Sequence, residues 1–137
     1  FTVTTHVSFK ARSQYDQCGL MVRVNAENWI KMGIEAEDTA VSRLGSVVTN
    51  LGKSDWATQD ISADVTERWY RLSRNGNDFL LEQGADGEAW QQMRITHLHA
   101  GAPQVEVGPY ACSPIGRDFW CRFSLVEITP NVWRLPD

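Results

Sequence analysis

The chain has little cysteine, no long apolar run and no excess of basic charge. Three cysteines, Cys18, Cys112 and Cys121, among 137 residues form no C-x-x-C pair and are too few for a disulfide scaffold. They indicate small thiols in a reducing compartment, and hence a cytoplasmic location. The apolar runs fall far short of the roughly 18 residues that cross a bilayer, so we expect no membrane partner. A net charge of −4 lacks the basic surface that nucleic acid requires, so we expect no nucleic-acid partner.

What the chain has is period-two alternation of apolar and polar residues, which is typical of half-buried strands. In residues 1–9, one face of the expected strand carries Phe1, Val3, Thr5, Val7 and Phe9. Residues 19–24 and 30–35 alternate in the same way. Further strands are expected at 42–49, 68–74, 79–82, 90–97, 104–112 and 119–128. The dipeptides Asn75-Gly76 and Asp86-Gly87 supply tight turns. The sequence predicts one all-β domain, a two-sheet antiparallel sandwich of the jelly-roll kind with almost no helix.

The first strand, residues 1–9, needs a hydrogen-bonding neighbour and an opposing sheet. We expect segment 119–128 as that neighbour, because its alternating Phe119, Cys121, Phe123 and Leu125 supply a matching apolar face. A residual N-terminal segment or a second copy, in a homodimer, are the alternatives.

The order of four stretches carries a family resemblance. They are YDQCGLMVR at 15–23, NWIKMGIE at 28–35, SVVT leading to SDW at 46–56, and VGPYACSP at 107–114. In this order they resemble one branch of the concanavalin A-like lectin/glucanase superfamily, the domain of unknown function that includes the fungal regulation-of-enolase proteins. The resemblance implies a jelly-roll fold and an association with carbohydrate, and it brings no established catalytic residues. Members of that branch carry a further aromatic-rich N-terminal portion, so we expect residues 1–137 to form a single domain without it.

Pairing the strands 19–24 and 30–35 through a three-residue loop, 26–28, matches their apolar faces and places Val24 opposite Ile30. On the other face this register sets Arg23 opposite Lys31, and two facing cations need an anion between them. That anion is either a carboxylate, from Glu35 or Asp16, or an acidic group of a ligand. Gly19 and Gly33 would leave this face open. A solvated polar face is the competing interpretation.

Glu35 and Asp16 are also the candidate catalytic residues, since a glycoside hydrolase uses two carboxylates as acid and as base or nucleophile. Trp56, expected in a loop, is the candidate for stacking on a sugar ring, with core packing as the alternative. Thr49, at the end of the SVVT stretch, is a further ligand-binding candidate. Arg94 either anchors an acidic ligand group or pairs with one of the 17 carboxylates of the chain.

Cys112 is counted as ligand-binding and becomes a nucleophile only if a base approaches it. His97 and His99 share a strand face, yet no third ligand stands at a recognisable spacing, so we expect no metal site and no cofactor. The function expected is a carbohydrate-associated domain that binds or processes a sugar-containing or acidic ligand in a concave groove lined by Arg23, Lys31, Glu35 and Trp56. The alternative is a non-catalytic regulatory or protein-interaction domain. If the protein is an enzyme, the expected activity resembles that of a glycoside hydrolase.

Overall fold

The computed structural model describes residues 1–136, which form ten strands and no helix. The strands are β1 (Thr2–Lys10), β2 (Gln17–Asn25), β3 (Asn28–Ala36), β4 (Val41–Asn50), β5 (Lys53–Ser62), β6 (Glu67–Asn75), β7 (Asp78–Gly84), β8 (Gln91–His97), β9 (Glu106–Cys112) and β10 (Trp120–Thr129). Within this part of the chain there is accordingly no apolar helix that would reach across a membrane. The expected all-β class is confirmed.

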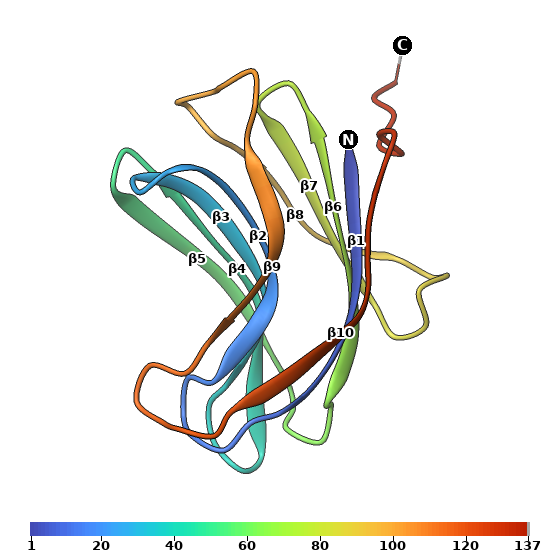
Figure 1. Cartoon of the computed structure of the whole chain (residues 1–137). Coiled ribbons are helices and arrows are strands. Elements are labelled where there is room, and N and C mark those ends of the chain that lie inside the picture. The colour runs from blue at the N-terminus through green and yellow to red at the C-terminus, as the bar shows by residue number, and fades with distance from the viewer. Residues whose placement is uncertain (137) are drawn as a thin grey trace.

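Two antiparallel five-stranded sheets lie face to face, as Figure 1 shows. Sheet A has the strand order β10-β1-β6-β7-β8, and sheet B has the order β5-β4-β3-β2-β9. Strand β1 pairs with β10 along its whole length and with β6 on its other side. The predicted neighbour of the first strand, segment 119–128, is therefore confirmed.

Apolar side chains of alternate residues fill the layer between the sheets, as the alternation predicts. Strand β1 contributes Val3 and Val7, which are fully buried, and the β2–β3 hairpin contributes Leu20 and Ile30. The largest fully buried side chains also include Tyr70, Phe79, Met32, Ile34, Leu72, Leu81 and Leu98. Because these side chains point inward, the intervening residues of sheet B must point outward and form its solvent face.

Strand β5 was not predicted, and Trp56 lies in it rather than in a loop. This strand is at the edge of sheet B, and residues 53–60 are all exposed. Only Ile61 of this strand packs against the core. A strand with no buried face carries no alternation of apolar residues, which is the signal that sequence reading depends on.

The predicted register of the β2–β3 hairpin was wrong by two residues. Arg23 lies opposite Trp29, and Lys31 lies opposite Met21. The turn has two residues, and the register shifts between Arg23 and Asn25, so that Val24 is the extra residue of a bulge. The apolar faces of β2 and β3 are matched by this bulge and not by the expected three-residue loop. Arg23 and Lys31 therefore do not face each other, and the anion inferred between them is not required.

Candidate functional site

The outer face of sheet B carries a row of glycines that runs across the strands. Gly19 of β2 lies opposite Gly33 of β3, and Gly33 lies opposite Gly45 of β4. The row continues to Tyr110 on β9, which pairs with Gly19, and to Thr58 on β5, which pairs with Gly45. We call Gly19, Gly33 and Gly45 the glycine row. Its floor is bare backbone, bounded on both sides by the side chains of the neighbouring rows.

The close approach of the strands excludes any side chain from this row. A Cβ atom on Gly33 would lie 2.1 Å from the carbonyl oxygen of Cys18, and one on Gly45 would lie 2.2 Å from that of Ala57. Both distances are far inside van der Waals contact, so even alanine requires the backbone to move. The strand packing thus enforces the hollow along this row.

Two rows of side chains flank the glycine row, and together they line a shallow pocket. On one side stand Gln17, Glu35 and Arg43, which are in register on β2, β3 and β4. On the other side the pocket is lined by Lys31, Val47 and Trp56, which are in register on β3, β4 and β5. Trp56 is 69% exposed.

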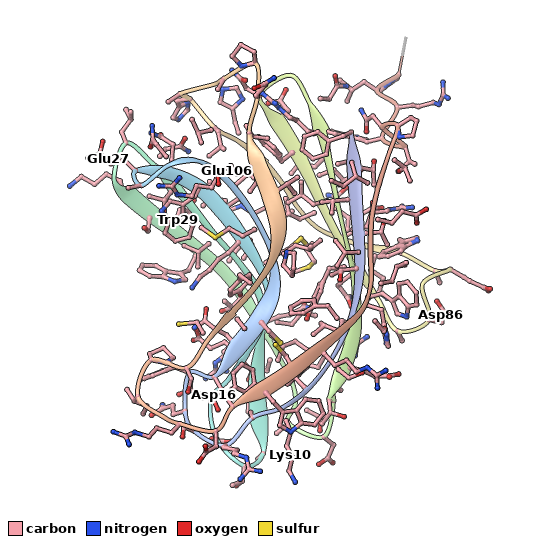
Figure 2. The ribbon with its side chains drawn as sticks, in the orientation of Figure 1. Lys10, Asp16, Glu27, Trp29, Asp86 and Glu106 are labelled. Carbon is pink, nitrogen blue, oxygen red and sulfur yellow. The ribbon has the colours of Figure 1, made fainter. Side chains whose placement is uncertain are left out.

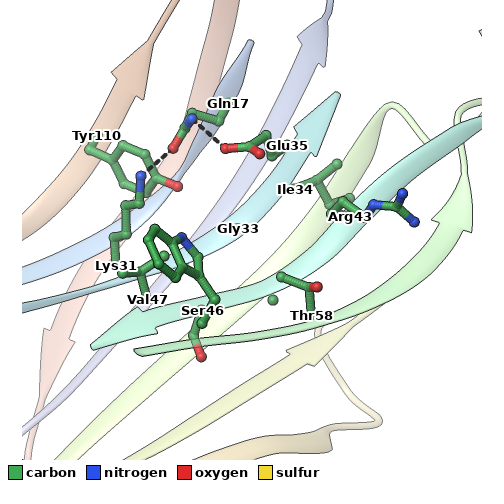
Figure 3. A pocket seen from close by; sticks show the side chains of 12 residues that line it. Gln17, Lys31, Gly33, Ile34, Glu35, Arg43, Ser46, Val47, Thr58 and Tyr110 are labelled. Atoms are coloured by element: carbon green, nitrogen blue, oxygen red, sulfur yellow. Dashed lines mark hydrogen bonds between the residues drawn. The ribbon is translucent and has the colours of Figure 1, made fainter. Parts of the chain in front are cut away.

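A hydrogen-bonded chain joins Lys31 to Glu35 through the amide of Gln17, as Figure 3 shows. The Lys31 ammonium donates to Gln17 Oε1 at 2.6 Å, and Gln17 Nε2 donates to Glu35 Oε2 at 2.6 Å. The same Nε2 also donates to the carbonyl of Tyr15 at 3.1 Å. The amide orientation is thereby fixed, because its oxygen faces the cation and its nitrogen faces the anion.

Tyr110 closes one end of the pocket. The Lys31 ammonium lies 5.8 Å from the centre of the Tyr110 ring, within the range of a cation–π contact. Burial raises the pKa of the Tyr110 hydroxyl, so the phenol stays neutral and can donate a hydrogen bond. In the flanking row of Gln17, Glu35 and Arg43, the Arg43 guanidinium pairs with Asp60 and lies 3.9 Å from the Glu37 carboxylate.

Three of the four residues expected in the groove, Lys31, Glu35 and Trp56, line this one pocket. Arg23 points from the same face one row further along, where its guanidinium lies 3.3 Å from Glu106. Thr49 occupies that row too, and its hydroxyl is hydrogen-bonded to Ser54 at 2.8 Å. Both side chains are therefore neighbours of the pocket rather than part of its lining.

The other candidates lie elsewhere. Arg94 of β8 reaches from sheet A to sheet B and donates to the Asp55 carboxylate on β5 at 2.8 Å, the protein pairing that was one of its two expected roles. Cys112 is exposed on β9, in register with Gln17. His97 Nδ1 donates to the Asp78 carboxylate at 2.6 Å, and within residues 1–136 no three potential ligands gather around a metal position.

Asp16 lies in the loop before β2, where Figure 2 shows it at one end of the sandwich. Its carboxylate accepts from the amides of Arg12 and Ser13 at 2.8 and 3.0 Å and from the Ser113 hydroxyl at 2.5 Å. Burial of the carboxyl opposes ionisation, but these donors outweigh it and lower the pKa of Asp16. The side chain joins the loop before β2 to the loop after β9, and of the proposed pair only Glu35 lines the pocket.

Several lining residues were not predicted from the sequence, among them Gln17, Arg43, Thr58 and Tyr110. Gly19 and Gly33 were recognised as leaving the face open, whereas Gly45 was not connected with them. The signal was present as one glycine in each of three neighbouring strands. It becomes visible only when the correct register of β2, β3 and β4 sets the three side by side.

Comparison with solved structures supports the fold. A functionally unknown protein from Saccharomyces cerevisiae superposes with a TM-score of 0.76 at 30% identity, over 90% of this chain and 69% of that one. The GH43 BlXynB protein from Bacillus licheniformis gives a TM-score of 0.72 at 13% identity, over 88% of this chain and 25% of that one. A xylan beta-1,4-xylosidase from Bacillus halodurans C-125 gives 0.69 at 17% identity, over 80% and 24%. The last two likenesses show a shared β-sandwich fold.

Sequence comparison gives the family. The Regulation of enolase protein 1 of Saccharomyces cerevisiae is 34% identical over 114 residues, which are 83% of this chain. This chain spans 56% of the length of that relative. The model of the family described as "Protein of unknown function (DUF1349)" matches residues 1–131. The chain therefore belongs to the DUF1349 family.

Proposed function

We propose that the pocket on the outer face of sheet B binds a neutral carbohydrate. The observation that carries this proposal is the bare floor of the glycine row beside Trp56, a residue that is 69% exposed. A sugar ring has an apolar face of C–H groups and a rim of hydroxyls. An exposed indole offers a large, rigid surface for the apolar face, and the backbone floor lets the ring approach the sheet closely.

The polar groups of the pocket suit the hydroxyl rim. Glu35 accepts hydrogen bonds, and the Lys31 ammonium has three donors, of which the bond to Gln17 uses one. The charges of Lys31 and Glu35 balance each other through Gln17, and Arg43 is balanced by Asp60. A pocket balanced in this way favours a neutral ligand over the acidic one that was the other expectation.

Binding is proposed rather than hydrolysis. A glycoside hydrolase places two carboxyl groups on either side of the scissile bond, about 5 to 9.5 Å apart. Glu35 lines the pocket, whereas the Asp16 carboxylate is occupied by three donors in its own loop. This arrangement supports binding through Glu35 rather than catalysis by the Glu35–Asp16 pair.

A glycan array that contains neutral and acidic oligosaccharides tests the proposal, followed by calorimetry on the neutral glycans it selects. Trp56→Ala removes the stacking surface without disturbing the core, and we expect an affinity loss of about tenfold, or about 1.4 kcal/mol. Trp120→Ala is the matched control, because Trp120 is 50% exposed on β10 of the other sheet. Absence of glycan binding, or an equal loss in both variants, contradicts the proposal.

A further inference from the structure

We infer that the pocket takes the end of a glycan chain, which enters over the β5 edge, and not an internal stretch of the chain. This inference rests on the proposed carbohydrate binding and specifies which part of the glycan is bound. It follows from a difference between the two ends of the glycine row, one of which is covered by side chains while the other is open.

The end of the row near β9 is closed by a bridge over its floor. Lys31 and Gln17 stand on opposite sides of the glycine row, and the 2.6 Å hydrogen bond between them crosses it. The Tyr110 ring lies beside this bridge, 5.8 Å from the Lys31 ammonium. Gly19 and Gly33 are consequently buried although they are on the outer face, whereas Gly45 is only half-buried. Figure 3 shows Lys31, Gln17 and Tyr110 gathered at this end.

The end near β5 has no such cover. Strand β5 is the edge strand, and Thr58, which continues the glycine row, is exposed together with the rest of residues 53–60. Neighbouring strands are about 4.8 Å apart, so the row from Tyr110 to Thr58 spans about 19 Å. The distance from the covered Gly33 to Thr58, within which the row is open, is only about 10 Å. An oligosaccharide lying along the whole row would collide with the bridge, while one that ends over Gly45 would not.

The chemistry of the bridge also selects a chain end. Glu35, Gln17 and Lys31 meet at the blind end of the open part, where they present one carboxylate and the two remaining ammonium donors. A terminal sugar has a free hydroxyl at the position where an internal sugar has a glycosidic bond. That hydroxyl can both donate to Glu35 and accept from Lys31. An internal residue would leave the second oxygen of Glu35 and the two remaining donors of Lys31 unsatisfied, which costs binding free energy.

The test uses cello-, xylo- and manno-oligosaccharides of defined length, from dimer to hexamer, with the whole chain in a titration calorimeter. For a series that binds, we expect the affinity to change less than threefold from dimer to hexamer and the stoichiometry to stay at one protein per glycan. An affinity that rises with each added sugar, or several proteins on one hexamer, overturns the inference and leaves carbohydrate binding standing. Failure of all three series overturns the proposed function itself.

Lys31→Met tests the bridge directly, since it keeps most of the side-chain length and removes the ammonium. We expect the ratio of hexamer to dimer affinity to rise at least fivefold, because the blind end opens. Lys53→Met, at the exposed first residue of β5, is the control and should leave the ratio unchanged. If the ratio in Lys31→Met equals that of the control, the bridge does not close the pocket and the inference fails.

Discussion

The substitution Gly33→Ala tests whether the glycine row is enforced by strand packing. The added methyl group would lie 2.1 Å from the carbonyl oxygen of Cys18 and 3.2 Å from the Cα of Gly19. Relief of such a clash costs about 1 to 3 kcal/mol as overpacking, and a weakened ladder hydrogen bond adds about 1 kcal/mol. Replacing glycine by alanine also stabilises the protein by about 0.4 to 1 kcal/mol, because alanine lowers the conformational entropy of the unfolded chain. The net expectation is a loss of about 1 to 3 kcal/mol from a total stability of about 7 to 20 kcal/mol.

Gly108→Ala is the matched control for Gly33→Ala. Gly108 lies on the same face of the same sheet, opposite Met21, yet a Cβ atom there would meet nothing within 4 Å. Urea unfolding followed by tryptophan fluorescence should give a lower midpoint for Gly33→Ala and an unchanged or slightly higher one for Gly108→Ala. Equal midpoints for the two variants would refute the argument that the partner strand excludes a side chain from the row.

Two further predictions concern titratable groups. Exposed Cys112 should react at once with a thiol reagent in the folded protein, while buried Cys18, whose pKa is raised by burial, should react only after unfolding in urea. Half-buried Cys121, whose pKa is also raised by burial, should react more slowly than Cys112, and prompt reaction of Cys18 would contradict its placement. Asp16→Asn should lower the urea midpoint at neutral pH. The pKa of Asp16 is lower in the folded than in the unfolded state. Its contribution to the free energy of unfolding is therefore fully present above the pKa of the unfolded carboxyl, about 3.9, and is lost as the pH falls further. The difference between wild type and variant should therefore shrink at about pH 3, and a difference independent of pH would count against the three hydrogen bonds to this carboxylate.

The fold could be predicted because strands with one buried face show alternating apolar and polar residues in the sequence. Residues 1–9 alternate so regularly that both the inner face of β1 and its pairing with β10 followed from the pattern. The pocket could be predicted only in part. Its register depends on a bulge at Val24, and a bulge changes the pairing without changing the alternation on either side. Trp56 and Thr58 lie on β5, a strand without a buried face, so the sequence showed the tryptophan but not the strand that positions it.

The exposed edge of β5 has a consequence for the state of the protein in solution. An edge strand presents unpaired amide and carbonyl groups, and an unguarded one is a template on which a second chain can add a strand. Charged side chains at Lys53, Asp55 and Asp60 oppose such growth, and the reach of Arg94 to Asp55 anchors the edge to the other sheet. The open end of the pocket lies over β5. A second protein chain that paired with the edge of β5 would therefore cover this open end. Under the proposed carbohydrate binding, self-association through β5 and glycan binding would then compete, and a saturating glycan would keep the protein dispersed.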